Sequence, residues 1–138
     1  MSDIKTETQI EKDIFRIVKA SEIAQIINGD VYRKGMRPLD AQTEDAVVAF
    51  HSGLDGQFQT GIVHLNVYVP KIDNDSAVKV KDITRVEELE AAIVRLFEEG
   101  VSDPYYELEV RETPASDDLD DIGQTRINTR IHYRRTTF

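Results

Sequence analysis

Residues 29–50 read GDVYRKGMRPLDAQTEDAVVAF, and this stretch marks the change from helical to extended chain. A helical pattern stops at Asn28-Gly29, and a short apolar step follows at Val31-Tyr32. A basic segment with Gly and Pro covers residues 33–38, and a new apolar run extends from Ala46 to Phe50. Gly is common just after the last turn of a helix, and a short apolar run fits a strand. The stretch therefore predicts a helix followed by a sheet.

The chain before this stretch has a helical pattern. Residues 8–19 place four apolar side chains on one face, namely Ile10, Ile14, Ile17 and Val18. Ser21 can cap a second, short helical segment that ends at Gly29 and turns Ile23, Ile26 and Ile27 inward. A single longer helix is the alternative, and the pattern leaves both open.

Thr84 to Glu99 has the clearest helical pattern in the chain. Thr84 and Glu87 have the spacing of a capping box, in which each side chain satisfies a free backbone N–H. The apolar stripe consists of Val86, Leu89, Ile93, Leu96 and Phe97. Gly100 follows the last turn, where a left-handed residue is expected.

Three later stretches alternate between apolar and polar residues, which is typical of half-buried strands. They are residues 61–69, 105–112 and 125–135, and Ala46–Phe50 makes a fourth strand. Pro70 ends the first of the three because it has no N–H to donate to a neighbouring strand. The predicted core consists of Val63, Leu65, Val67, Leu89, Ile93, Leu96, Leu108, Val110, Ile127 and Ile131.

The order helix, two strands, helix, two strands predicts an α+β fold. Successive strands joined by a loop favour antiparallel pairs, so we predict an antiparallel four-stranded sheet with helices packed on one face. We predict one domain over residues 1–138, with a disordered N-terminus at residues 1–7 and a mobile acidic loop at residues 113–123. The other connection of unusual length covers residues 34–44.

Composition excludes several classes of protein. A chain of 138 residues can bury a sizeable core, and without cysteine it has no disulfide, thiol catalysis or zinc–thiolate site. The longest apolar run, Ala46–Phe50, is far too short to span a membrane. The N-terminal residues lack the basic and then apolar pattern of a signal peptide. We therefore expect a soluble, unexported protein without membrane contact.

The net charge of −9 is unevenly distributed. Residues 126–138 contain four arginines and no acid, so the first 125 residues carry −13. Duplex DNA binding usually needs a dominant basic face, so we predict no sequence-specific nucleic acid binding. Contact between basic and acidic parts, within one chain or between copies, is favoured. The candidate interface residues are Arg126, Arg130, His132, Arg134 and Arg135, with Asp117, Asp118, Asp120 and Asp121.

We assign no catalytic, cofactor-binding or metal-ligating residues. The acidic runs at residues 73–75 and 117–121 lack the ligand spacing of a calcium loop. The three histidines, His51, His64 and His132, have no local pairing that would hold a metal. No serine lies in a Gly-x-Ser-x-Gly elbow, and the glycines form no phosphate-binding run. The sequence therefore favours a protein that is not an enzyme.

From about Ile14 to Tyr133 the chain resembles the tail-completion or tail-terminator proteins of bacteriophages, including short members from prophage regions of bacterial genomes. The matching features are Asn28-Gly29-Asp30-Val31-Tyr32, Arg37-Pro38, Val67-Tyr68-Val69-Pro70, the 84–99 helix and the paired final strands. The resemblance implies a non-enzymatic structural protein that forms a ring, commonly hexameric, at the head–tail joint. It implies other phage structural proteins as partners, no cofactor, and a location in the virion or in the bacterial cytoplasm during assembly.

A second interpretation is that the chain is a protein-binding module that does not come from a phage. The polar sheet face and the two long loops could serve a protein-binding module that captures a single partner. A stable closed oligomer favours the ring, whereas a strict monomer favours the module.

For the ring interpretation, the acidic charge suggests a hypothesis: an acidic ring would repel DNA and let it slide through the central channel of the ring.

Overall fold

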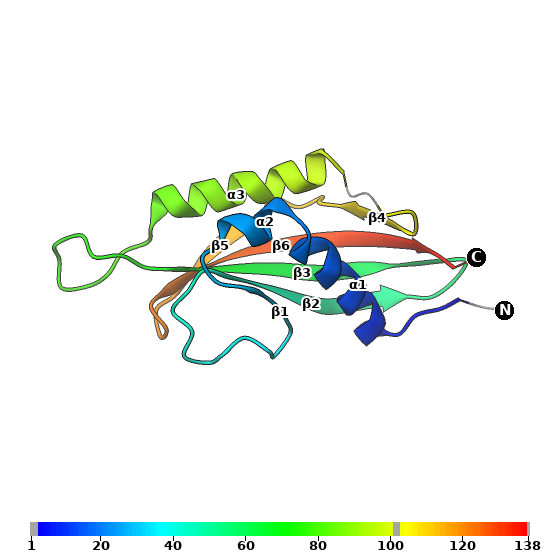
Figure 1. The fold of residues 1–138 in the computed structure, drawn as a ribbon, viewed down its shortest axis with the longest axis horizontal. Coiled ribbons are helices and arrows are strands. Elements are labelled where there is room, and N and C mark those ends of the chain that lie inside the picture. The colour runs from blue at the N-terminus through cyan, green and yellow to red at the C-terminus, as the bar shows by residue number, and fades with distance from the viewer. Residues whose placement is uncertain (1–2, 101–102, 138) are drawn as a thin grey trace.

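A computed structural model describes residues 3–100 and 103–137 of the chain. Helices and strands follow one another as shown in Figure 1. They are α1 (Glu7–Lys19), α2 (Glu22–Ile26), β1 (Val31–Arg33), β2 (Asp45–Leu54), β3 (Phe58–Pro70), α3 (Ile83–Glu98), β4 (Tyr106–Glu109), β5 (Ala115–Leu119) and β6 (Gln124–Thr136). The structure confirms the α+β class.

The sheet has six strands and is mixed, so the prediction of four antiparallel strands was wrong. The strand order is β1-β2-β3-β6-β4, and β5 pairs with β6 beside β4. β1 runs parallel to β2, with Val31 opposite Ala46, and the other pairs are antiparallel. A parallel pair needs a connection that brings the chain back to the starting end of the sheet, and residues 34–44 provide it.

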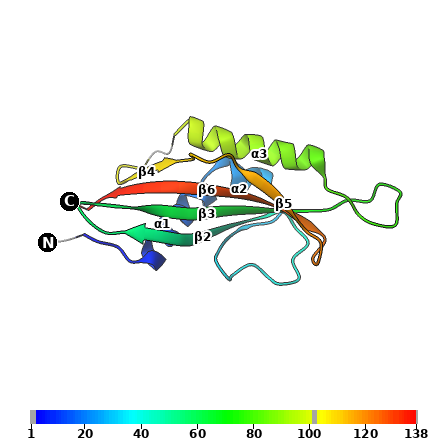
Figure 2. The same ribbon diagram turned by 180° about the vertical axis from the view of Figure 1, so that it is seen from behind.

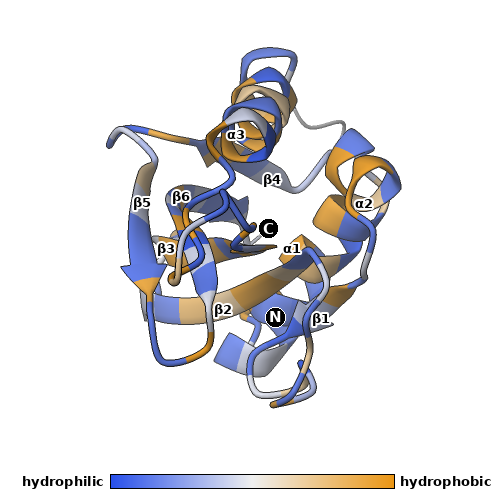
Figure 3. Cartoon of the chain, turned by 90° about the vertical axis from the view of Figure 1, so that its left-hand side faces the viewer, coloured by the Kyte–Doolittle hydropathy of each residue, from blue (hydrophilic) through white to orange (hydrophobic). Residues whose placement is uncertain are grey.

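All three helices lie on one face of the sheet, as predicted. Figure 2 shows β2, β3 and β6 in front of α1 and α2, with α3 above the strands, and Figure 3 shows the helices gathered on one side. Val63, Leu65 and Val67 of β3 are buried against Ile14 of α1 and Leu89 of α3 in one apolar core. Of the predicted core residues, Leu96, Leu108 and Val110 are only partly buried, because they lie where α3 meets the short edge strand β4.

The caps explain where the helices begin. A capping box of Thr6 and Gln9 starts α1. α3 is capped by Asp82, whose carboxylate accepts the Arg85 N–H at 3.2 Å, so the predicted box of Thr84 and Glu87 was wrong. The two N-terminal helical segments are separate, because the chain turns at Ser21.

Two segments were predicted to be disordered or mobile, and these predictions stay untested, although the structure shows contacts in both. Residues 3–6 lie against the sheet, where the Lys5 N–H donates to Gln59 at 3.0 Å. The 113–123 segment contains β5, so it is a strand at its centre, while its mobility stays a prediction. Among the described residues, no helix has both the length and the apolar character needed to cross a bilayer.

Candidate interaction surfaces

The face of the sheet opposite the helices, which we call the open face, carries polar side chains in cross-strand rows. Successive side chains of a strand alternate between the faces, so the polar residues of β3 and β6 meet here. One row places Tyr68 beside Arg126 and Asp117, and another places Thr60 beside Arg134 and Glu107. The alternation read from the sequence thus brings most of the predicted basic residues to one surface.

Acids of the same chain neutralise two of the three open-face arginines. Arg126 donates to Asp117 at 2.8 Å, and this hydrogen bond raises the pKa of Arg126. Arg134 lies 3.6 Å from Glu107 and stacks over the ring of Phe58 at 3.8 Å. Arg130 is exposed and forms no ion pair with the described residues, because it lies between the segments covered by β4 and β5.

Arg135 does not belong to this surface, although the sequence grouped it there. Its side chain points to the helix side and is only 2% exposed. The guanidinium donates to the Asp3 carbonyl at 2.6 Å and to the Gln59 side chain at 3.1 Å. Position in the strand explains the difference, since odd-numbered residues of β6 face the core.

The acidic segment finds its partners within the chain. Lys71 lies 2.7 Å from Asp120 and 3.8 Å from Asp118, and these contacts raise the pKa of Lys71. Asp117 pairs with Arg126. Asp121, the last of the predicted acidic interface residues, is exposed. Among the described residues, no group of three or more His, Asp and Glu side chains could hold a metal ion.

The histidines of the open face form two separate contacts. His132 lies 2.7 Å from Glu112, and this hydrogen bond lowers the pKa of Glu112. The rings of His51 and His64 stack with centroids 4.8 Å apart. Burial, followed by the charges of His51 and Arg130, lowers the pKa of His64. The lowered pKa favours the neutral form of His64, whose Nδ1 lies 2.9 Å from the Asn128 amide.

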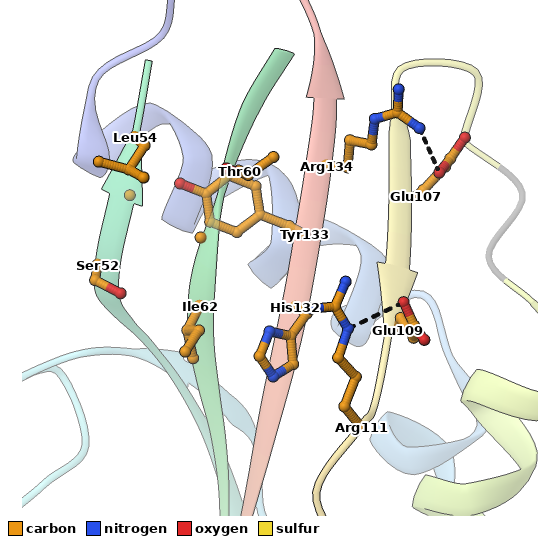
Figure 4. Close-up of a pocket in the computed structure, with 12 residues that line it drawn as sticks. Ser52, Leu54, Thr60, Ile62, Glu107, Glu109, Arg111, His132, Tyr133 and Arg134 are labelled. Carbon is orange, nitrogen blue, oxygen red and sulfur yellow. Dashed lines mark hydrogen bonds and ion pairs between the residues drawn. The ribbon is translucent and has the colours of Figure 1, made fainter. Parts of the chain in front are cut away.

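A shallow depression of about 530 Å³ lies on the open face at the β4 end (Figure 4). Its sides carry the ion pairs Arg134–Glu107 and Arg111–Glu109, which appear as dashed lines. Leu54, 75% exposed, adds an apolar element. Paired charges around exposed apolar carbon suit contact with a polypeptide surface.

Residues 28–45 form a dense network of hydrogen bonds that the sequence alone did not reveal. Gly29 donates to the Glu44 carbonyl at 2.9 Å, and the Asp30 N–H donates to the Asp45 carboxylate at 2.8 Å. A Cβ at residue 29 would lie 2.0 Å from that carboxylate, so glycine is required by close approach. β1 and the start of β2 are held together here.

Two arginines complete this structure, which we call the loop anchor (Gly29, Arg37, Glu44, Asp45 and Arg85). Arg37 lies 2.8 Å from the fully buried Asp45 carboxylate and stacks over the Tyr68 ring at 4.3 Å. Arg85 donates to both Glu44 oxygens at 2.6 and 2.8 Å, which raises the pKa of Arg85, and also donates to the Ile26 carbonyl. The anchor joins α2, α3 and β2.

The loop anchor fixes the base of the 34–44 loop and leaves its tip outside. Arg37 donates to the Thr43 carbonyl at 3.1 Å, and Gln124 of β6 donates to the Ala41 carbonyl at 2.7 Å. Met36 is 68% exposed, and Leu39 is fully exposed at 102%. The loop therefore presents two apolar side chains on a fixed base. We call these two residues, Met36 and Leu39, the loop tip.

The surfaces described above are the candidate sites of this chain: the open face with its depression, and the loop tip held by its anchor. No protein-family model matches the chain, and a search of the curated proteins finds no significant match.

Proposed function

We propose that this chain is a non-enzymatic structural protein of a phage or prophage. It assembles as a ring-shaped homo-oligomer that completes the tail or joins it to the head, and it needs no cofactor. Its partners are further copies and other phage structural proteins, and it is found in the virion or in the bacterial cytoplasm during assembly. The open face and the loop tip supply contact surfaces rather than reacting groups.

The observation that carries this proposal is the anchored 34–44 loop. Two of the stretches that carry the family resemblance, Asn28-Gly29 and Arg37-Pro38, lie at or beside the loop anchor. A loop held at its base loses little conformational freedom when it binds, so more of the contact energy remains as affinity. An exposed Met and Leu on such a loop provide the apolar contact that a subunit interface needs at its centre.

The charge of the chain supports the proposed location at a DNA channel. A net charge of −9 gives a ring of copies a strongly acidic character, which would repel the DNA backbone and let it pass. The basic side chains of the open face are largely paired with acids of the same chain. They therefore offer little attraction to phosphate.

The test is the native mass of the full chain over a range of concentrations, combined with electron microscopy of the particles. We expect one closed oligomer with rotational symmetry, and binding of that oligomer to isolated tail tubes. A strict monomer that also fails to bind tails or heads would contradict the proposal.

A protein-binding module is the second candidate function, and the depression on the open face favours it. The exposed Arg130 shares the open face with Arg134, which lines the depression, and both would meet an acidic partner bound across this face. Changing both arginines to Glu should leave the fold intact and weaken capture of such a partner, with loss of its salt dependence. Unchanged binding at low and moderate salt would remove this face as an interface.

A further inference from the structure

An apolar groove separates α3 from β4 and from the chain that follows β4. Val94 and Phe97 form its helix side, and Leu108, Val110 and Pro114 form the other side. Val94 is 41% exposed although it is aliphatic. The volume is about 270 Å³, below the roughly 300–1,000 Å³ typical of small-molecule pockets. The α3–β4 groove therefore has the size to receive one or two side chains of a protein.

Acidic residues flank the helix side of this groove. Three glutamates share the side of α3 on which Val94 lies. Glu87 and Glu90 precede Val94 by seven and four residues, and Glu98 follows it by four, so helical spacing places all three around it. None of the three forms an ion pair with the described residues. An occupant with apolar side chains and a nearby positive charge would complement the groove.

The loop tip has this character. Met36 and Leu39 are the exposed apolar side chains, and Lys34 is exposed two residues before Met36. Lys34 forms no ion pair within residues 3–100 and 103–137, whereas Arg37 is already paired with Asp45. The loop thus carries one available cation beside two apolar side chains on a fixed base.

The loop cannot reach the groove of its own chain. The loop follows β1 at one edge of the sheet, and the groove lies beside β4 at the other edge. Four strand spacings separate β1 from β4, which is about 19 Å at the usual spacing. Figure 1 shows the loop, in cyan, below the sheet and α3 above it. The occupant must come from another molecule.

We propose that the loop tip of one copy inserts into the α3–β4 groove of the next copy. Leu39 fills the apolar groove, and Lys34 lies close to the acidic residues around Val94. The proposal rests on the homo-oligomer of the proposed function, and it names the contact that builds it. Because the two surfaces differ and lie at opposite edges, the contact is head-to-tail, and repeating it generates a ring when the rotation closes.

Two single substitutions test the contact from its two sides. Leu39→Asp and Val94→Asp should each weaken self-association at least about ten-fold, the loss typical of a central interface residue. Both positions are exposed, so circular dichroism and the thermal midpoint should stay close to those of the wild type. Leu54→Asp is the matched control, because Leu54 is also exposed but lies in the open-face depression, and it should retain the native mass.

Mixing the two variants separates a head-to-tail contact from any other explanation. The Leu39→Asp chain keeps an intact groove, and the Val94→Asp chain keeps an intact loop tip. At a concentration at which each variant alone is monomeric, the mixture should form a one-to-one heterodimer and no larger species. A charge exchange adds a second test: Lys34→Glu should weaken assembly in a salt-dependent way, and adding Glu98→Lys should restore it.

The outcomes distinguish this inference from the proposed function. A wild-type oligomer that persists in both Asp variants overturns the loop–groove contact alone and leaves the ring in place. A wild-type chain that stays monomeric at all concentrations overturns both. Loss of assembly in Leu54→Asp, with the other two variants unaffected, places the contact on the open face instead.

Discussion

The two long connections of this chain, residues 34–44 and 113–123, look alike in sequence but differ in structure. Both are polar, contain proline and exceed the usual length of a hairpin loop. The first is an irregular loop with its base fixed by Arg37 and its apolar tip exposed. The second becomes strand β5, and its acids pair with Lys71 and Arg126.

The difference shows how charge is used in the two regions. In the first, one arginine is removed from water against a fully buried carboxylate, so the ion pair is an internal support. In the second, the carboxylates of the ion pairs stay exposed, and the pairs accompany backbone pairing with β6. A buried pair can hold a projecting loop in one position, whereas exposed pairs mainly orient a strand that the sheet already holds.

The largest expected change in the free energy of unfolding is at Arg37. Changing Arg37 to Ala leaves the Asp45 carboxylate buried without its positively charged partner, and the expected loss in free energy of unfolding is about 3–5 kcal/mol. Urea unfolding at pH 7 measures it. Arg126→Ala, in the second region, is the control and should cost at most about 1 kcal/mol. Equal losses would mean that the two regions do not differ as described.

A smaller effect is expected at Gly29, beneath the same loop. A methyl group there would lie 2.0 Å from the Asp45 carboxylate and 2.4 Å from the Glu44 carbonyl, so both must move. Gly29→Ala should lower the free energy of unfolding by about 1–3 kcal/mol. Gly56→Ala is the matched control, because its new methyl group meets its nearest atom at 3.4 Å. A tolerated Gly29→Ala would show that the anchor can adjust.

The smallest expected change in the free energy of unfolding is at Asp117 in the acidic strand β5. Asp117→Asn removes the partner of Arg126 while β5 remains paired with β6, and we expect a loss of about 1 kcal/mol or less. The loss should shrink further as salt is added, because exposed pairs are screened. A large loss that salt does not change would place this pair among the internal supports, and the comparison between the regions would fail.

The sequence predicted the features that depend on periodicity. The helical spacing of Ile10, Ile14 and Val18 and the alternation around Val63, Leu65 and Val67 gave the right elements and the right buried face. It failed for β1 and β5. β1 has three residues, too few for a period, and β5 is an acidic strand whose side chains oppose the usual strand pattern.

The candidate surfaces were predicted less completely. Alternation placed Arg126, Arg130 and Arg134 together, yet it could not show that two of them are paired within the chain. The buried position of Arg135 was readable, because it shares its face with Ile131 and Tyr133. Arg37 and Asp45 are close together in the sequence, so an ion pair between them could have been suggested. Nothing in the residues alone shows that the Asp45 carboxylate is buried.

Hydrogen–deuterium exchange of the wild-type chain, below and above its association concentration, tests most directly whether the 34–44 loop is the contact element. We predict that the peptide covering residues 36–41 exchanges fast in dilute solution at the amides of Arg37, Leu39 and Asp40, and that it becomes protected as the chain associates. Amides of Ala115–Leu119, which belong to the sheet, should keep the same protection at both concentrations. Protection that changes with concentration in Ala115–Leu119, but not in residues 36–41, would contradict the account.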